Sequence, residues 1–184
     1  MSGDKYLISD QHACYFLTFT IIRWIDVFTN RVYRDIIVES LKYCMSRKGL
    51  TLYAWVIMSN HLHLIGEVTR PNTMSEFIRD FKKFTSREIA KAIQKENDSR
   101  KDWLLDKFSF EARKTGRAKN YKLWKDDSHA VDLTNNDIEA MERIDYIHEN
   151  PVKAGWVDLP EHYLYSSARD YAGSNGLLNV KLLT

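Results

Sequence analysis

Two apolar runs separated by only three residues constrain the fold of this chain more than any other feature. The runs are Leu50–Ile57 and His61–Val68, and both are rich in aliphatic and aromatic residues. The short connection over residues 58–60 predicts that the two runs pair as neighbouring antiparallel strands of a hairpin. A chain with such a hairpin is expected to build a sheet around it.

The segments on either side of the hairpin predict one more strand and two helices. Residues 15–22 are aromatic and β-branched, which indicates a first strand. Over residues 30–47 apolar side chains recur at steps of three and four, and Gly49 follows where a helix would stop. Residues 73–76 have the form of a capping box and open a second helix that reaches about Gln94.

A last helix is predicted to begin at residues 135–137 and to be terminated by Pro151. The basic and aromatic segment 107–125 could supply a further strand before it. This order of elements predicts an α+β fold, an antiparallel sheet with helices packed on one face, of the ferredoxin-like or RRM-like type. The apolar positions expected on the buried side of the last helix are Ile138, Met141, Ile144 and Ile147.

Length and composition narrow the class of protein. With 184 residues, 44% of them hydrophobic, the chain is expected to form one domain over residues 1–184, with residues 157–184 as a C-terminal tail. The formal charge of +2 does not by itself indicate a nucleic-acid partner, so a binding surface must come from local clustering of charge. The two cysteines lack ligand spacing, which argues against a structural zinc site. The N-terminus lacks a leader pattern and no apolar run approaches a membrane span, so we expect a soluble cytoplasmic protein without membrane contact.

Two groups of residues are candidates for chemistry. His61 and His63 alternate along a predicted strand and therefore share one face, where two imidazoles could hold a metal ion. The competing interpretation is a pair of hydrogen-bonded histidines on a half-buried strand. Tyr146 and Asn150 lie four residues apart on the last helix, so they share a face as well, although Tyr146 could also be a packing residue.

Basic residues gather in two places. Side chains spaced by four from Arg79 to Lys95 form a stripe along the second helix, and segment 107–125 mixes basic with aromatic residues, as suits phosphates and stacked bases. The competing interpretations are a solvated helix face and, for Trp124, a core position. The predicted DNA contacts are Arg79, Lys83, Arg87, Arg113, Arg117, Lys122 and Trp124.

These motifs together resemble a known family. Residues 61–63 followed by the helix segment 145–155 are similar to the single-tyrosine (Y1) transposases of the IS200/IS605 type, which are HUH nucleases, and within them to the branch associated with repetitive extragenic palindromes (REP). The likeness covers most of the chain, including residues 55–60 and the tail segment 160–167.

The resemblance implies a single-stranded DNA endonuclease and strand transferase that cleaves and rejoins DNA near hairpins through a 5′-phosphotyrosine intermediate. In it, Tyr146 is the nucleophile, and His61, His63 and Asn150 are the ligands of a divalent metal, Mg²⁺ or Mn²⁺. The implied partner is single-stranded or hairpin DNA, and the resemblance is compatible with either a monomer or a homodimer. The rival hypotheses are a non-catalytic nucleic-acid-binding module on the same fold, such as a domesticated transposase, and a metal-dependent nuclease that uses water in place of the tyrosine.

Overall fold

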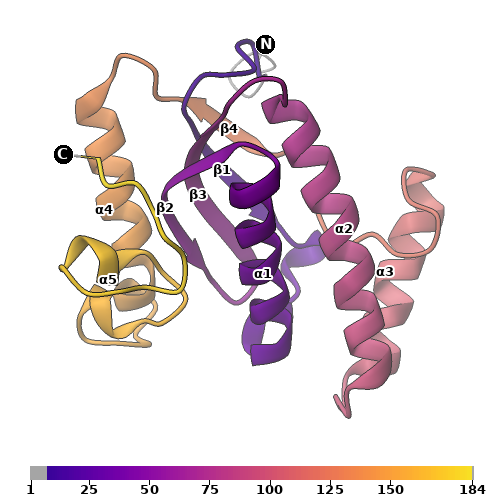
Figure 1. The fold of residues 1–184 in the computed structure, drawn as a ribbon. Helices are drawn as coiled ribbons and strands as arrows, with labels where there is room; N and C mark the ends of the chain where they lie inside the picture. Colours follow the sequence, from indigo (N-terminus) through magenta and orange to yellow (C-terminus); the bar gives the residue numbers. More distant parts are fainter. Residues whose placement is uncertain (1–7, 184) are drawn as a thin grey trace, which may run out of the picture.

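A computed structural model describes residues 8–183, which surround a four-stranded antiparallel sheet (Figure 1). The strand order is β2-β3-β1-β4, and the predicted hairpin forms the β2–β3 pair. The predicted α+β class is confirmed. Residues 1–7, which belong to the N-terminal segment considered above, and Thr184 lie outside the described residues. The strands are β1 (Tyr15–Thr20), β2 (Leu50–Ile57), β3 (His61–Val68) and β4 (His129–Asp132).

Side chains cap the starts of all three predicted helices, and at the last of them Asn136 accepts a hydrogen bond from the backbone amide of Glu139. The side chain of Asn30 accepts a hydrogen bond from the backbone amide of Val32, and Thr73 and Glu76 form the reciprocal capping box. Gly49 follows the first helix with a φ of +68°, a conformation that glycine adopts without strain. The α-helices are α1 (Arg31–Arg47), α2 (Met74–Lys95), α3 (Lys101–Thr115), α4 (Asp137–Lys153) and α5 (Ala168–Tyr171), and the short 3-10 helices are η1 (Ile22–Trp24), η2 (Val27–Thr29) and η3 (Pro160–His162).

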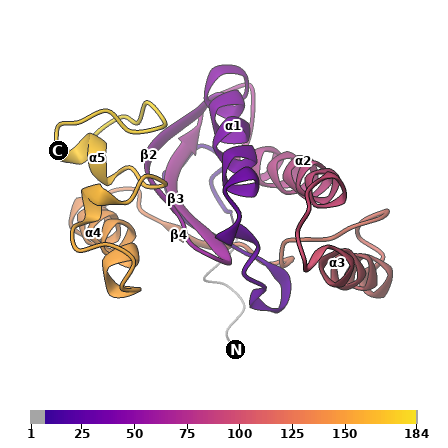
Figure 2. The same cartoon turned by 90° about the horizontal axis from the view of Figure 1, so that it is seen from below.

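Helices cover both faces of the sheet. Helices α1 and α2 lie on one side and α4 lies on the other (Figures 1 and 2). The expectation that all helices pack on one face was therefore wrong for α4. The physical reason is that both faces of β1 are apolar: Phe16, on the α4 side, and Leu17, on the opposite side, are both fully buried.

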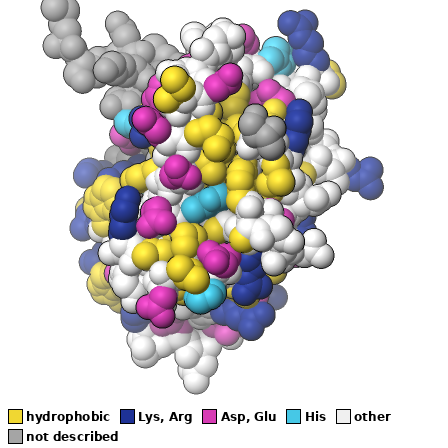
Figure 3. Space-filling view, turned by 90° about the vertical axis from the view of Figure 1, so that its left-hand side faces the viewer, with side chains coloured by type: hydrophobic (Ala, Val, Ile, Leu, Met, Phe, Trp, Pro, Cys, Tyr) yellow, Lys and Arg dark blue, Asp and Glu magenta, His cyan; other side chains and the backbone are white. Residues whose placement is uncertain are grey.

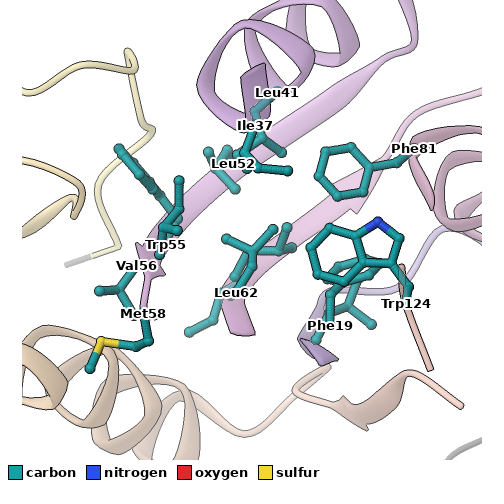
Figure 4. Close-up of a cluster of buried hydrophobic side chains, with 14 of the residues drawn as sticks. Phe19, Ile37, Leu41, Leu52, Trp55, Val56, Met58, Leu62, Phe81 and Trp124 are labelled. Carbon is teal, nitrogen blue, oxygen red and sulfur yellow. The ribbon is translucent and has the colours of Figure 1, made fainter. Parts of the chain in front are cut away.

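The core on the α1 and α2 side is partly aromatic. Ile37 and Leu41 of α1 point toward the sheet, while Phe81 of α2 lies beside Phe19 and Trp124 (Figure 4). The ring centroid of Phe19 is 5.3 Å from that of Phe81 and 5.9 Å from that of Trp124. The indole N–H of Trp124 is also satisfied inside the core, where it donates to the Thr85 hydroxyl at 2.8 Å.

Segment 107–125 differs from the prediction. Most of it belongs to helix α3 and the loop that follows, and the additional strand is β4, further along the chain. Helix α3 packs against α2 and buries Leu104, Phe108 and Ala112, which recur at four-residue steps.

Helix α4 also differs in detail. Ile144 and Ile147 are buried as predicted, but Ile138 is 76% exposed and Met141 is 42% exposed. Ala140 takes the buried position in the first turns, so the apolar stripe is rotated relative to the expected one. Pro151 lies within the last turn and does not end the helix, which extends to Lys153.

The C-terminal tail covers the free edge of β2. The backbone amide of Ile57 donates to the Tyr165 carbonyl at 3.0 Å, and that of Ser167 donates to the Trp55 carbonyl at 3.0 Å. These bonds occupy donors and acceptors that an open sheet edge would expose. None of the helices in the described part of the chain combines the length and hydropathy needed to cross a bilayer.

Candidate active site

The two histidines of β3 lie side by side on the face of the sheet that α4 covers. Their ring centroids are 4.7 Å apart. Nδ1 of His61 lies 2.7 Å from Oδ1 of Asn60, and because an amide oxygen only accepts, this Nδ1 carries the proton. Nδ1 of His63 shares a hydrogen bond with the Thr18 hydroxyl at 2.9 Å. These bonds orient both rings and leave each Nε2 as the free ring nitrogen, an arrangement typical of metal-ligating histidines.

Burial keeps both imidazoles neutral. Desolvation lowers the pKa of His61 to about 4. The pKa of His63 is lowered to about 3, mainly by desolvation and further by the nearby His61, His129 and Arg143. Because only the neutral imidazole coordinates a metal ion, both side chains are in the form required for binding at neutral pH.

Tyr146 lies directly beside this pair. Its ring contacts that of His63 edge-on, with 5.3 Å between the centroids, and its side chain stays partly exposed. Phe16 of β1 stacks on His63 at 5.2 Å and meets the Tyr146 ring at 6.2 Å. The structure therefore brings together His61, His63 and Tyr146, and Phe16 fixes the spacing between strand and helix.

Asn150 lies one turn beyond Tyr146. Its side-chain amide donates to the Tyr146 carbonyl at 2.6 Å, which leaves its oxygen as an acceptor. Within residues 8–183 no cluster of three or more His, Cys, Asp and Glu side chains could hold a metal ion. A metal on the histidine pair would thus need a further ligand of another kind, and an amide oxygen such as that of Asn150 suits Mg²⁺ and Mn²⁺.

Two cations near Tyr146 were missed from the sequence. The guanidinium of Arg143 lies 5.0 Å from the centre of the Phe16 ring, and the ammonium of Lys153 lies 6.0 Å from that of Tyr146. Arg143 precedes Tyr146 by three residues and Lys153 follows it by seven, so helical spacing places both on the same face of α4 as Tyr146. This spacing is the sequence signal from which Arg143 and Lys153 could have been predicted. Lys153 supplies positive charge beside the phenol, while the guanidinium of Arg143 also pairs with the Glu139 carboxylate at 3.3 Å.

The predicted DNA contacts are spread over several surfaces. Arg79, Lys83 and Arg87 are exposed on α2, in the layer on the far side of the sheet from Tyr146 (Figure 2). Arg79 pairs with the adjacent Asp80 and Arg87 with the adjacent Glu88. The remaining exposed candidates, near the C-terminal end of α3, are Arg113 and Arg117.

The structure corrects the expectation for Lys122 and Trp124. Trp124 is only 2% exposed and belongs to the core. Lys122 is 8% exposed, and its ammonium bonds to the Asp126 carboxylate at 2.7 Å. Neither side chain faces solvent, because the loop after α3 returns to the sheet, where the backbone of Trp124 forms an isolated antiparallel β-bridge with that of Ile21.

The outer side of α4 and the C-terminal tail has a different character. Apolar and acidic side chains predominate there, and lysines and arginines gather toward the margins (Figure 3). Such a face would repel a polyanion.

Comparisons with known proteins bear on the fold and the family of this chain. A solved structure of a REP-associated tyrosine transposase bound to a REP hairpin superposes with a TM-score of 0.55, at 19% identity, over 97% of this chain and 90% of its own. The crystal structure of a candidate transposase from Deinococcus radiodurans R1 gives a TM-score of 0.45 at 16% identity, over 78% of this chain and 93% of its own. No curated protein matches the sequence. The family model for IS200-like transposases matches residues 11–115, more than half of the chain, and the chain therefore belongs to the IS200-like transposase family.

Proposed function

We propose that this protein cleaves and rejoins single-stranded DNA beside hairpins through a covalent link to Tyr146. The observation that carries the proposal is the contact between Tyr146 and His63 within one chain. Attack of the phenolic oxygen on a phosphodiester forms a tyrosyl phosphate at the 5′ end and releases the 3′-hydroxyl, so the reverse attack by a 3′-hydroxyl rejoins the strand without another energy source. Hairpin recognition is inferred from the family resemblance and from the hairpin-bound relative.

A divalent metal fits the donor set. His61 and His63 would hold it through their free Nε2 atoms, and Asn150 would add its amide oxygen. When bound, the ion neutralises and polarises the scissile phosphate. Two imidazole nitrogens match Mn²⁺ better than Mg²⁺, which prefers oxygen ligands.

This chain's own groups supply the rest of the chemistry. Phe16 holds the Tyr146 ring against His63, while Arg143 and Lys153 attract the phosphate and stabilise the charge that develops on it. One chain contains all of these residues, so we propose that a dimer is not needed to complete the site. The exposed arginines of α2 and α3 would contact more distant DNA phosphates.

The rival function, a nucleic-acid-binding module of the RRM type, requires aromatic side chains on an open sheet face. On the α4 side of this sheet Phe16 and Ile65 are fully buried. The face that such a module would use is therefore covered.

The test is covalent capture of DNA. Labelled hairpin DNA with single-stranded extensions is incubated with the protein and Mn²⁺, denatured, and examined for a protein–DNA adduct. We expect an adduct with wild-type protein and none with Tyr146→Phe or His61→Ala. The matched controls Tyr43→Phe, an exposed tyrosine on α1, and His162→Ala should retain it. An adduct that persists in Tyr146→Phe would overturn the nucleophile assignment.

A further inference from the structure

Two exposed tryptophans from distant parts of the sequence border one cavity near His61. Trp24 follows β1 and is 56% exposed, and Trp103 belongs to α3 and is 48% exposed. The cavity measures about 370 Å³ and is open to solvent. A single exposed aromatic side chain is common on protein surfaces, but two that border the same cavity form a contiguous apolar surface of the kind found at binding sites. Its lining consists of Arg23, Trp24, Ile25, Asp26, Arg100, Trp103 and Lys107.

The backbone that presents Trp24 is unusual. Arg23 has a φ of +54° and Trp24 a φ of +56°, so two successive residues with full side chains adopt the left-handed conformation. Such strain persists only when the surroundings hold it. Here the backbone amide of Ile22 donates to the Leu123 carbonyl at 2.7 Å, and that of Trp24 donates to the Ile21 carbonyl at 3.1 Å. The turn thus holds an indole away from the core, which indicates a role outside packing.

Asn60 connects this turn to the histidine pair. Its side-chain amide donates to the Trp24 carbonyl at 3.3 Å and to the Asp26 carboxylate at 3.0 Å, while its oxygen accepts from His61. The Trp24 and His61 rings are 6.3 Å apart. A DNA strand with its phosphate at His61 would therefore bring a neighbouring nucleotide to Trp24.

The charges around the cavity match a polyanion. The ammonium of Lys125 lies 4.1 Å from the centre of the Trp24 ring, and Arg23 lies 5.5 Å from that of Phe110. The guanidinium of Arg100 is already bonded to Asp98, to the Asp26 carbonyl and to the Thr29 hydroxyl. The Asp26 carboxylate accepts from Asn60, so neither side chain determines the charge of the ligand. Exposed indoles beside lysine and arginine are the combination that binds unpaired bases and their phosphates.

We infer that Trp24 and Trp103 form a stacking site for an unpaired nucleotide next to the scissile phosphate. The inference rests on the proposed function and deepens it, because it identifies the part of the substrate that must be single-stranded. Aromatic stacking does not depend on which base is present, so this site would select for an unpaired strand rather than for a sequence.

Binding to a fluorescent oligonucleotide tests this inference separately from cleavage. The probe is an oligothymidylate of about 12 nucleotides that carries one 2-aminopurine, whose fluorescence is quenched when the base stacks on an indole. All proteins carry Tyr146→Phe, so no covalent product forms. We expect quenching by the parent protein and an affinity loss of about 5- to 100-fold in Trp24→Ala and Trp103→Ala, the range known for removal of one stacking partner.

Controls separate stacking from misfolding. Trp156→Ala removes another exposed tryptophan, located after α4, and should bind like the parent. Trp24→Phe should recover part of the quenching, and all variants should keep the parent's thermal midpoint. Equal affinity of Trp24→Ala and the parent, or equal binding of the probe annealed to its complement, would overturn the inference. Failure of the adduct test would contradict the proposed function while leaving this binding result intact.

Discussion

The phenol ring of Tyr146 meets the imidazole of His63 edge-on, with 5.3 Å between the ring centroids, although α2, α3 and β4 separate the two residues along the chain. The contact arises because α4 crosses the sheet face opposite α1 and α2. A helix packed there brings its side chains onto the face of β3 that carries His61 and His63, while the core leucines Leu62 and Leu64 point to the opposite face. The position of α4 is thus the feature on which the proposed site depends.

Asn60 should control metal affinity. Asn60→Ala removes the oxygen that accepts from Nδ1 of His61, so the ring would lose its fixed tautomer and orientation. We expect Mn²⁺ to bind about 10- to 100-fold more weakly, as for other losses of a partner that orients a ligand. Isothermal titration calorimetry measures this directly. Asn120→Ala, at an exposed loop position, is the control, and unchanged affinity in Asn60→Ala would contradict the prediction.

The hairpin, the helix caps and the histidine spacing could be predicted because each depends on residues close in sequence. The buried face of the first turns of α4 could not be predicted. Ile138 and Met141 have the spacing of an apolar helix stripe, and only packing against the sheet decides which stripe is buried. Helix α3 was not predicted although Leu104, Phe108 and Ala112 recur at four-residue steps, because the basic and aromatic residues among them also fit a nucleic-acid-binding segment.

For the candidate site, Tyr146 and the histidines were predicted from their motifs, and the folded chain brings their rings together. The contributions of Asn60 and Trp24 could not, because they depend on a turn after β1 that meets the β2–β3 connection only in the folded chain. The same applies to Trp124. Its basic neighbours indicated a DNA contact, but the loop after α3 returns it to the core.

Arg143 should accelerate adduct formation without being the nucleophile. Replacing it by Gln removes a cation beside Phe16 and Tyr146. We expect formation about tenfold slower, which corresponds to the loss of roughly one charge-assisted hydrogen bond of ~1.4 kcal/mol. Arg143→Lys should recover part of the rate, and Arg47→Gln, at the exposed end of α1, should leave it unchanged. Single-turnover kinetics with Mn²⁺ and hairpin DNA give the comparison, and a wild-type rate for Arg143→Gln would exclude this role.

Trp124 should matter for folding rather than for DNA contact. Trp124→Ala removes a buried indole that packs on Phe19 and Phe81 and donates to Thr85, so we expect a loss of about 3 to 5 kcal/mol in the free energy of unfolding. Trp103→Ala, at an exposed position, should change it by less than about 0.5 kcal/mol. Urea denaturation measures both. Similar values for the two variants would show that the indole of Trp124 is not a core element.

Buried histidines should make stability depend on pH. Burial lowers the pKa of His148 to about 4, as it does for His61, and His148 also bonds to the Ser167 hydroxyl at 2.9 Å. Because the folded pKa lies below the unfolded value of about 6.5, the unfolded chain binds protons between these limits that the folded chain does not. The stabilisation is therefore complete above pH 6.5 and is lost as the pH falls toward 4, by about 1.4 kcal/mol per pH unit for each such histidine.

Urea denaturation of the metal-free protein at pH 7.5, 6 and 5 measures this dependence. His148→Gln should reduce the slope of stability against pH by the contribution of one histidine. Equal slopes for His148→Gln and the wild type would mean that His148 has the same pKa in the folded and unfolded states. That outcome would also remove the reason to expect a neutral, tightly packed contact between α4 and the C-terminal tail, on which the placement of Tyr146 relies.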